Sequence, residues 1–205
     1  TNAGLQMGRR SIHTPEELRE NIVVAATELI ANSGLSGLSA REIARRIGYS
    51  PGTIYNVFVN LDDLILNIEG RMLDDLDASL AALPANSDPR AHLLALAEAY
   101  LAFTHNNPRL WNLLFEHHLP ASVDVPVEYR NKLNALLERI ENALRPLAVT
   151  DDEADLKRRA RVLWAGVHGI TSLSTADKLS NITAEATWPL VKDLVETYLD
   201  GLKVR

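Results

Sequence analysis

Hydrogen-bonding side chains are concentrated in residues 49–58, where the sequence reads YSPGTIYNVF. Ile54 and Phe58 lie one helical turn apart and can face a core together, so the polar side chains between them point elsewhere. Hydroxyl and amide groups on an exposed helix can contact base edges, and a glycine lets the backbone approach phosphate. The stretch therefore predicts a DNA-contacting helix. Its candidate contacts are Thr53 and Asn56 to bases, and Ser50, Gly52 and Tyr55 to phosphates.

This helix is too short to be stable alone, so neighbouring elements must position it. Its start is marked by Ser50, a favourable N-cap, and by Pro51, whose missing N–H costs nothing in a first turn. Just before it, the residues SARE at 39–42 form a capping box that opens a helix ending at Gly48. A helix, a short turn containing glycine and a second helix predict a helix-turn-helix.

Helices are also expected on either side of this motif. Residues 14–17, TPEE, combine an N-cap, a proline and a capping-box glutamate, and open a helix that stops near Gly34. After the motif, Asn60 can cap a helix over residues 61–83, which ends before Pro84 and joins two parts of the fold.

The remaining chain has helical spacing throughout and lacks the alternating pattern of strands. The helices expected there cover residues 90–105, 108–119, 127–147 and 151–177, followed by a last helix that ends near residue 201. The pattern leaves open whether the last helix begins at Ala184 with a kink at Pro189 or begins at Trp188. The fold class expected is all-α.

The charge of the chain is unevenly distributed. The 205 residues have a formal net charge of −6 at pH 7, yet the part up to residue 61 carries six arginines against five glutamates. The excess of acid therefore lies in the C-terminal part. A basic surface is expected from Arg9, Arg10, Arg41, Arg45 and Arg46, although Arg45 and Arg46 fit a solvated helix face equally well.

Several function classes are disfavoured by the sequence. Without cysteine the chain has neither disulfides nor thiolate metal sites. It contains no apolar run that could span a bilayer, and we expect no signal peptide. We therefore expect a cytoplasmic protein that does not enter the membrane. His117 and His118 lack metal-ligand spacing because adjacent helix residues point apart, so no metal is expected. Motifs for phosphate loops or nucleophile elbows are missing, and we expect no cofactor and no enzymatic activity.

Residues 29–64, LIANSGLSGLSAREIARRIGYSPGTIYNVFVNLDDL, closely resemble the N-terminal DNA-binding domain of TetR-family transcriptional regulators. The resemblance rests on the helix IARRIG, the sequence SPGTIY and the phenylalanine that follows it. A shorter stretch at residues 164–169, WAGVHG, is similar to the Trp-His-Gly signature of one C-terminal ligand-binding subfamily.

The resemblance implies an N-terminal three-helix DNA-binding domain at residues 1–61 and a C-terminal helical bundle for ligand binding and dimerisation at residues 62–205. It implies a homodimer in which the last two helices of each subunit form a four-helix interface, with a ligand cavity in each C-terminal domain. The DNA-facing positions carried over are Ser39, Arg41, Tyr49, Ser50, Pro51, Gly52, Thr53, Tyr55 and Asn56.

One position departs from the family pattern. Leu61 stands where most members have a phosphate-binding lysine, and the neighbouring Asp62 and Asp63 would repel phosphate. The positive charge expected to compensate comes from Arg9, Arg10 and Arg41.

Aromatic residues and one histidine are the candidates to line the ligand cavity. They are Tyr100, Phe103, Trp111, Phe115, Trp164 and His168. Their helical spacing also fits ordinary core, and both interpretations remain open. His168 would orient a ligand by hydrogen bonding, or be a core histidine bonded to a carbonyl. The basic run at residues 157–161 is interpreted as a solvated helix face with local ion pairs.

These features predict a dimeric, ligand-responsive transcriptional regulator that binds palindromic, double-stranded operator DNA. We expect a repressor released by a small, largely apolar effector, with the helix over residues 61–83 as the transmitter. One alternative is a constitutive dimeric regulator, which a tightly packed C-terminal core would favour. The other is a helical small-molecule-binding protein or enzyme that has lost DNA binding.

Overall fold

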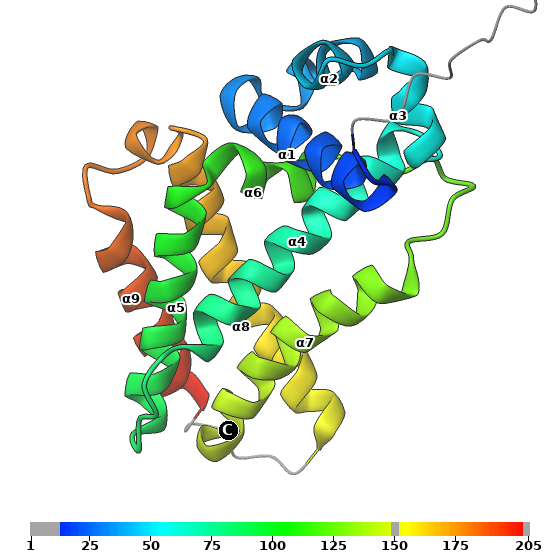
Figure 1. Cartoon of the computed structure of the whole chain (residues 1–205). Helices are drawn as coiled ribbons and strands as arrows, with labels where there is room; N and C mark the ends of the chain where they lie inside the picture. The colour runs from blue at the N-terminus through cyan, green and yellow to red at the C-terminus, as the bar shows by residue number, and fades with distance from the viewer. Residues whose placement is uncertain (1–12, 149–151, 203–205) are drawn as a thin grey trace, which may run out of the picture. The chain divides into compact units, whose positions relative to one another are not determined.

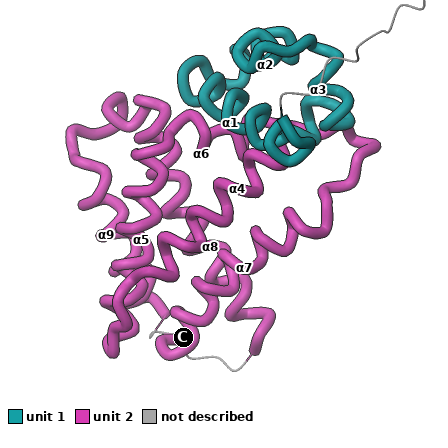
Figure 2. The backbone as a smooth tube through the Cα atoms, in the orientation of Figure 1, with its two compact units in different colours: residues 1–64 teal, residues 65–205 magenta. Residues whose placement is uncertain are grey.

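The computed structural model describes residues 13–148 and 152–202, and all regular secondary structure there is helical (Figure 1). Nine α-helices and three short 3₁₀ segments make up its regular structure, and no strand occurs in the ranges described. The prediction of an all-α fold is confirmed. The chain divides into two compact units between Leu64 and Ile65, shown in two colours in Figure 2, whereas the sequence places this boundary after Leu61.

The first unit is built from three helices and the beginning of a fourth. Their bounds are α1 Pro15–Ser33, α2 Ala40–Ile47, α3 Pro51–Val57 and α4 Leu61–Ala81, with a 3₁₀ turn at Leu35–Gly37. Helix α2 packs against both α1 and α3. The core of the unit is supplied by buried residues of all four helices, among them Ile22, Val23, Ala26, Leu29, Ile30, Ile43, Ala44, Ile54 and Leu64, and by Phe58 at the end of α3.

The caps of α1 and α2 follow the sequence signals with one difference. The Thr14 hydroxyl accepts a hydrogen bond from the backbone N–H of Glu17, and the Glu17 carboxylate accepts one from the backbone N–H of Thr14, which completes a capping box. Ser39 likewise accepts from the backbone N–H of Glu42. The Glu42 carboxylate, however, binds the nearby Arg45 guanidinium, so the second capping box is only half formed.

The turn between α2 and α3 depends on a glycine in left-handed backbone geometry. Gly48 closes α2 with φ of 76° and ψ of 30°, which a residue with a Cβ adopts only with strain. Ser50 occupies the N-cap position of α3 as expected, and Pro51 begins the helix. The expected side-chain cap is wrong, because the Ser50 hydroxyl lies 3.1 Å from the Thr53 hydroxyl and bonds that group instead of a backbone N–H.

The second unit continues α4 and adds five helices. These are α5 Pro89–Asn106, α6 Pro108–Glu116, α7 Val127–Leu144, α8 Glu153–Thr175 and α9 Thr187–Gly201. Helix α8 packs against α7 and α9, and α5 packs against α7, α8 and α9, so α5 and α8 are central to the bundle (Figure 1). One hydrophobic core draws buried residues from all six helices, including Leu76, Leu96, Trp111, Leu144, Leu163 and Val195.

Prolines set two helix ends in this unit. Helix α7 stops at Leu144 and passes into a 3₁₀ turn at Arg145–Leu147, because Pro146 cannot continue an α-helix. Helix α9 begins at Thr187, so Pro189 lies in its first turn, where a proline is tolerated. Among the described helices, none is both long and apolar enough to cross a lipid bilayer.

Candidate functional site

Helix α3 presents polar side chains on its solvent side. Tyr55 is 53% exposed, and Asn56 and Gly52 are also exposed, whereas Ile54 and Phe58 are buried on the other side. A Cβ added to Gly52 would meet only the Ser50 hydroxyl oxygen, at 3.8 Å, so the backbone at this point is open to close approach. Pro51 is exposed and Thr53 half-buried.

An arginine from α1 holds the C-terminal end of this short helix. The Arg19 guanidinium carbon lies 4.2 Å from the centre of the Phe58 ring, within the range of a cation–π interaction. Its Nη1 also donates to the backbone carbonyl of Val57 at 3.3 Å. Together with the burial of Ile54, these contacts explain how a helix too short to stand alone is kept in place.

Four of the predicted DNA-facing side chains make hydrogen bonds within the unit, and two of these, Ser50 and Thr53, bond each other. The Tyr49 hydroxyl lies 2.8 Å from Nδ1 of His13, and the Ser39 hydroxyl is exposed but caps α2. Arg41 is exposed at the start of α2. The geometry therefore gives Tyr49 and Ser39 a part in fixing α2 and α3, and leaves the outward positions to Arg41, Tyr55 and Asn56.

The other arginines of the expected basic surface differ in their partners. Arg45 and Arg46 both pair with Glu42, and Arg46 also pairs with Glu28 at 3.4 Å. These contacts agree with the interpretation of a solvated helix face whose charged side chains form ion pairs. Arg9 and Arg10 lie outside the described residues.

The start of α4 is stabilised by side chains of the chain itself. The Asn60 side-chain oxygen accepts from the Asp63 backbone N–H at 2.8 Å, and the Asp63 carboxylate accepts from the Val59 backbone N–H at 3.1 Å. Asp63 therefore has a structural part in this turn. Leu61, at the position of the family lysine, is half-buried and supplies no positive charge.

In the second unit, an aromatic cluster forms around Trp111 on α6. Its ring centre lies 5.4 Å from that of Tyr100 and 6.1 Å from that of Phe103, both on α5 and both in edge-to-face geometry. Phe115, one turn further along α6, lies 5.8 Å away. These distances are typical of stabilising aromatic pairs.

His168 on α8 joins this cluster from the other side. Its imidazole stacks on Phe115 at 4.2 Å and on Trp164 at 5.1 Å, and its Nδ1 lies 2.9 Å from the Tyr100 hydroxyl. Burial lowers the pKa of His168, so the imidazole stays neutral at pH 7 and Nδ1 can accept from the tyrosine. The structure thus brings all six candidate side chains together, and the partner of His168 is a tyrosine hydroxyl, not a carbonyl.

A cavity of about 320 Å³ adjoins the cluster and lies within the second unit. Four of the six candidates, Tyr100, Trp111, Phe115 and Trp164, line it, whereas Phe103 and His168 are not part of its wall. A smaller space of about 50 Å³ shares part of this wall. The rest of the wall comes from residues that the sequence analysis did not single out: Leu73, Leu76, Leu80, Leu114, Tyr129, Leu133, Leu136, Leu137 and Ile140.

A buried carboxylate, that of Glu69, lies next to Tyr129 of the cavity wall. The Glu69 carboxylate of α4 is 3.0 Å from Nδ1 of His117, and both side chains are almost completely buried. Burial raises the pKa of Glu69, and His117 and a hydrogen bond with Tyr129 act against this rise. Burial, together with Glu69, also raises the pKa of Tyr129. Helix α4 is thereby tied to the end of α6 and the start of α7.

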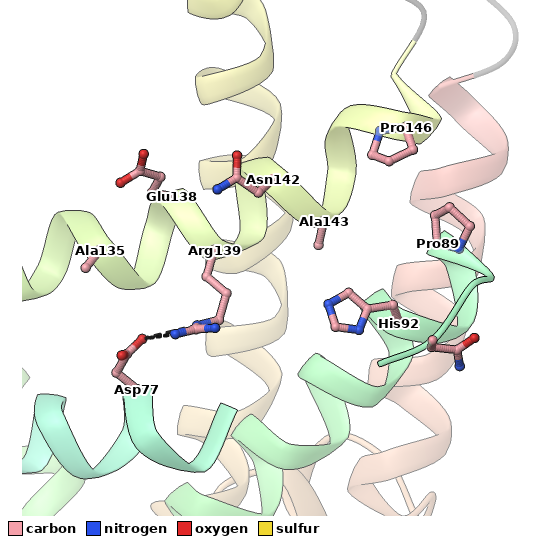
Figure 3. A pocket seen from close by; sticks show the side chains of 10 residues that line it. Asp77, Pro89, His92, Ala135, Glu138, Arg139, Asn142, Ala143 and Pro146 are labelled. Atoms are coloured by element: carbon pink, nitrogen blue, oxygen red, sulfur yellow. Dashed lines mark hydrogen bonds and ion pairs between the residues drawn. The ribbon is translucent and has the colours of Figure 1, made fainter. Parts of the chain in front are cut away.

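A second, more polar groove of about 480 Å³ lies between α4, the start of α5 and α7 (Figure 3). Asp77 and Arg139 face each other across it, with 2.6 Å between Nη2 and Oδ1. His92 and Asn142 also line the groove, and Asn142 and Glu138 are exposed. Because its main charged groups already bind each other and its rim is open, the groove is a weaker ligand site than the apolar cavity.

Helix α8 has one apolar face that is exposed in the described part of the chain. Val162 is 53% exposed and Leu173 is 38% exposed, and the exposed Ala165 and Gly169 lie between them on the same side of the helix. The basic run at residues 157–161 precedes this face. Arg158 and Arg159 make the expected local ion pairs, both with Asp155. Arg161 instead pairs with Glu141 of α7, and Arg159, Asp155 and Glu141 are largely buried, so this part of the run is not a solvated face.

Two protein-family models match the chain in the parts that carry these features. The model described as bacterial regulatory proteins, tetR family, matches residues 22–68, which include α2 and α3. The model described as tetracyclin repressor-like, C-terminal domain, matches residues 93–198, more than half of the chain. The likeness to the Trp-His-Gly subfamily stays a prediction.

Individual relatives agree with the family models. The transcriptional activator FasR of Mycolicibacterium smegmatis is 26% identical over 175 residues, which cover 84% of this chain and 78% of that protein. A Rhodococcus protein of unknown function has the same fold, with a TM-score of 0.75, 24% identity, and coverage of 95% of this chain and 99% of that one.

A further solved structure is that of Thermus thermophilus FadR, described as a TetR-family repressor in complex with lauroyl-CoA. It has a TM-score of 0.65 and 25% identity, with 91% of this chain and 96% of that one covered. The helix-turn-helix geometry, the two family models and these relatives lead to one conclusion. The chain belongs to the tetR family of bacterial regulatory proteins and is a DNA-binding transcriptional regulator.

Proposed function

We propose that this regulator binds a palindromic operator as a homodimer in the cytoplasm and is released from it by a small, largely apolar effector. The observation that carries the proposal is the combination of an exposed polar recognition helix with an apolar cavity of about 320 Å³ in one chain. The cavity lies at the lower end of the size range of small-molecule sites, which runs from about 300 to 1,000 Å³.

The DNA contacts proposed are those of the exposed side of α3 and its approach. Asn56 and Thr53 are assigned to base edges, and Tyr55 together with the Gly52 backbone to phosphates. Arg41 is assigned to the backbone of the DNA, where it partly replaces the charge that the family lysine would supply at Leu61. The supporting DNA-facing positions are Ser39, Tyr49, Ser50 and Pro51.

The dimer proposed uses the last two helices of each subunit. The exposed face of α8 that contains Val162 and Leu173 supports this, because an apolar helix face with small residues allows a second helix to approach closely. Two recognition helices about 34 Å apart would then read half-sites one turn of DNA apart.

Release by effector requires a difference in affinity between two conformations. An effector that prefers the DNA-incompetent conformation must do so by about 1.4 kcal/mol for each tenfold loss of operator affinity. We assign α4 as the transmitter, because this one helix begins in the first unit, at Leu61, and continues into the second. There its residues Leu73, Leu76 and Leu80 line the cavity.

The two alternatives make different use of the same features. A constitutive regulator has no need of the cavity, so the cavity favours the ligand-responsive reading. A protein that has lost DNA binding would account for Leu61, but it would leave the exposed Tyr55 and Asn56 unexplained. Repression is proposed over activation because release on effector binding follows directly from the coupling described.

A neutral ester of lauric acid is a suitable first probe, because it keeps the apolar acyl chain of lauroyl-CoA, the ligand of the Thermus relative, without the charged CoA part. We would measure its binding by calorimetry and the affinity of the protein for labelled DNA flanking its own gene by fluorescence anisotropy. Saturating probe is expected to lower operator affinity at least about tenfold, equivalent to 1.4 kcal/mol. Leu133→Trp, at a partly exposed position of the cavity wall, should abolish the response, and Val127→Trp, on the same helix but outside the wall, should retain it. Probe binding without any change in operator affinity would contradict the coupling.

A further inference from the structure

The C-terminal end of the recognition helix α3 is held by Arg19 of α1. The last carbonyls of an α-helix have no partner within the helix, so they need donors from elsewhere. At the end of α3, the Val57 carbonyl accepts a hydrogen bond from Nη1 of Arg19 at 3.3 Å. Phe58, the next residue, already has extended backbone geometry, with φ of −123° and ψ of 135°. Arg19 therefore binds α3 at the point where the helix ends.

The same guanidinium also lies over the ring of Phe58. Its carbon is 4.2 Å from the ring centre, and Phe58 is only 1% exposed, so the ring is fixed in the core of the unit. A planar guanidinium can stack on a ring and donate to a carbonyl together, whereas the ammonium of lysine is a point charge without a planar face. The contacts of Arg19 therefore depend on its shape and not on positive charge alone.

The start of α3 is anchored separately. Tyr49 directly precedes the N-cap Ser50, and its hydroxyl lies 2.8 Å from Nδ1 of His13. His13 directly precedes Thr14, the N-cap of α1, and Arg19 lies in the second turn of that helix. The beginning of α1 thus holds α3 at both ends. Loss of the Arg19 contacts would free one end of α3 and leave the other end in place.

The side chains proposed to read the operator lie next to the end that Arg19 holds. Tyr55 and Asn56 are exposed and immediately precede Val57. A binding group must be held to within about 0.5 Å to form its intended contacts. Binding to DNA of unrelated sequence depends mainly on positive charge near phosphates, and is far less sensitive to such a shift. A displaced end of α3 would therefore reduce operator affinity more than general DNA affinity.

We infer that Arg19 is a positioning residue for operator recognition. By holding Val57 and Phe58 it directs Tyr55 and Asn56 toward the DNA, and it thereby sets the preference for the operator over unrelated DNA. Arg19 acts through α3 and does not bind DNA itself. The inference rests on the proposed function, because it assumes that α3 reads the bases of an operator.

Arg19→Lys tests the inference, because it keeps the charge and removes the planar group. Fluorescence anisotropy gives the affinities of the full-length wild type and variant for DNA flanking the gene and for a duplex of the same composition in scrambled order. Affinity for the flanking DNA is expected to fall at least about fivefold, equivalent to one base contact, and affinity for scrambled DNA should stay unchanged. Arg130→Lys, the same change at an exposed arginine of α7, should behave as the wild type.

Two further measurements separate positioning from other roles. In Arg19→Met, the salt dependence of binding to scrambled DNA should equal that of the wild type, and a slope smaller by about one would show a direct phosphate contact. Hydrogen exchange followed by mass spectrometry needs no DNA. In Arg19→Lys, exchange should increase in peptides covering residues 55–58 and stay unchanged in those covering residues 22–30 of α1. Faster exchange throughout the first unit would show an effect on stability alone.

Either of those contrary results would overturn the inference. An unchanged ratio of the two DNA affinities in Arg19→Lys, or an equal fall in both, would also overturn it. In these cases the preference of the wild type for the flanking DNA would leave the proposed function standing. A wild type that binds both duplexes equally would overturn operator recognition itself, and the inference with it.

Discussion

Single polar side chains have opposite environments in the two units. In the first unit the outward-facing Tyr55 and Asn56 are exposed to solvent and therefore available to DNA. In the second unit the hydroxyl of Tyr100 and the imidazole of His168 are bonded to each other inside an aromatic cluster. The first arrangement suits recognition of a highly charged polymer, and the second suits a neutral ligand.

The neutral state of His168 gives a testable pH dependence. Because burial lowers its pKa in the folded state, the unfolded chain binds more protons once the pH falls below the ordinary histidine value of about 6.5. The stabilisation from neutral His168 is therefore complete above that value and is lost as the pH falls toward the folded-state pKa. A protonated imidazole would also no longer accept from Tyr100.

Urea unfolding of the wild type and of His168→Gln between pH 7.5 and 5.5 measures this effect. The free energy of unfolding of the wild type relative to that of the variant should decrease as the pH falls, since glutamine does not titrate. A difference that stays constant, or grows at lower pH, would show that His168 is not held neutral by its surroundings.

Most elements could be predicted from the sequence because their signals are local. The capping box at Thr14, the left-handed Gly48 and the Pro51 start of α3 each depend on residues within one turn of each other. The hydroxyl of Ser50 does not cap α3, because it bonds the hydroxyl of Thr53. Competition of that kind depends on side-chain rotamers, which spacing does not specify.

Some residues of the candidate ligand site could likewise be predicted from the sequence, and others could not. The aromatic residues of α5, α6 and α8 could be selected by type and helical face. The leucines of α4 and α7 that complete the cavity wall have the spacing of any core stripe, so nothing in the sequence distinguishes them. The Glu69–His117 pair joins residues 48 positions apart in the chain, so it follows from the tertiary fold and not from local spacing.

At the scale of elements, the Glu69–His117 pair is expected to fix α4 in the second unit. Glu69→Ala would leave His117 and Tyr129 without the buried carboxylate, and should destabilise the unit by about 3–5 kcal/mol. The control Asp74→Ala lies on α4 like Glu69, and it removes an exposed ion pair with Lys132 of α7. It should lower the free energy of unfolding by only about 0–1 kcal/mol. Tryptophan fluorescence during urea unfolding is a suitable measurement, because all three tryptophans lie in the second unit. Similar losses for both variants would contradict a structural role specific to Glu69.

At the scale of the whole molecule, recognition and sensing are assigned to different units that share one helix. The first unit is small and is held by a compact core and the contacts of Arg19. The second unit contains a cavity within a larger core, and α4 enters both. Separate units joined by a continuous helix allow the occupancy of one site to influence the other, provided that the two conformations bind effector differently.

The central claim is that the exposed side of α3 binds operator DNA. It is tested most directly by fluorescence anisotropy with DNA flanking the gene, using the wild type, the double variant Tyr55→Ala, Asn56→Ala, and the control Val24→Ala on the exposed side of α1. The wild type and control should bind tightly, with an affinity that falls steeply between about 50 and 200 mM salt, and the double variant should bind at least about tenfold more weakly. Wild-type affinity in the double variant would contradict the claim.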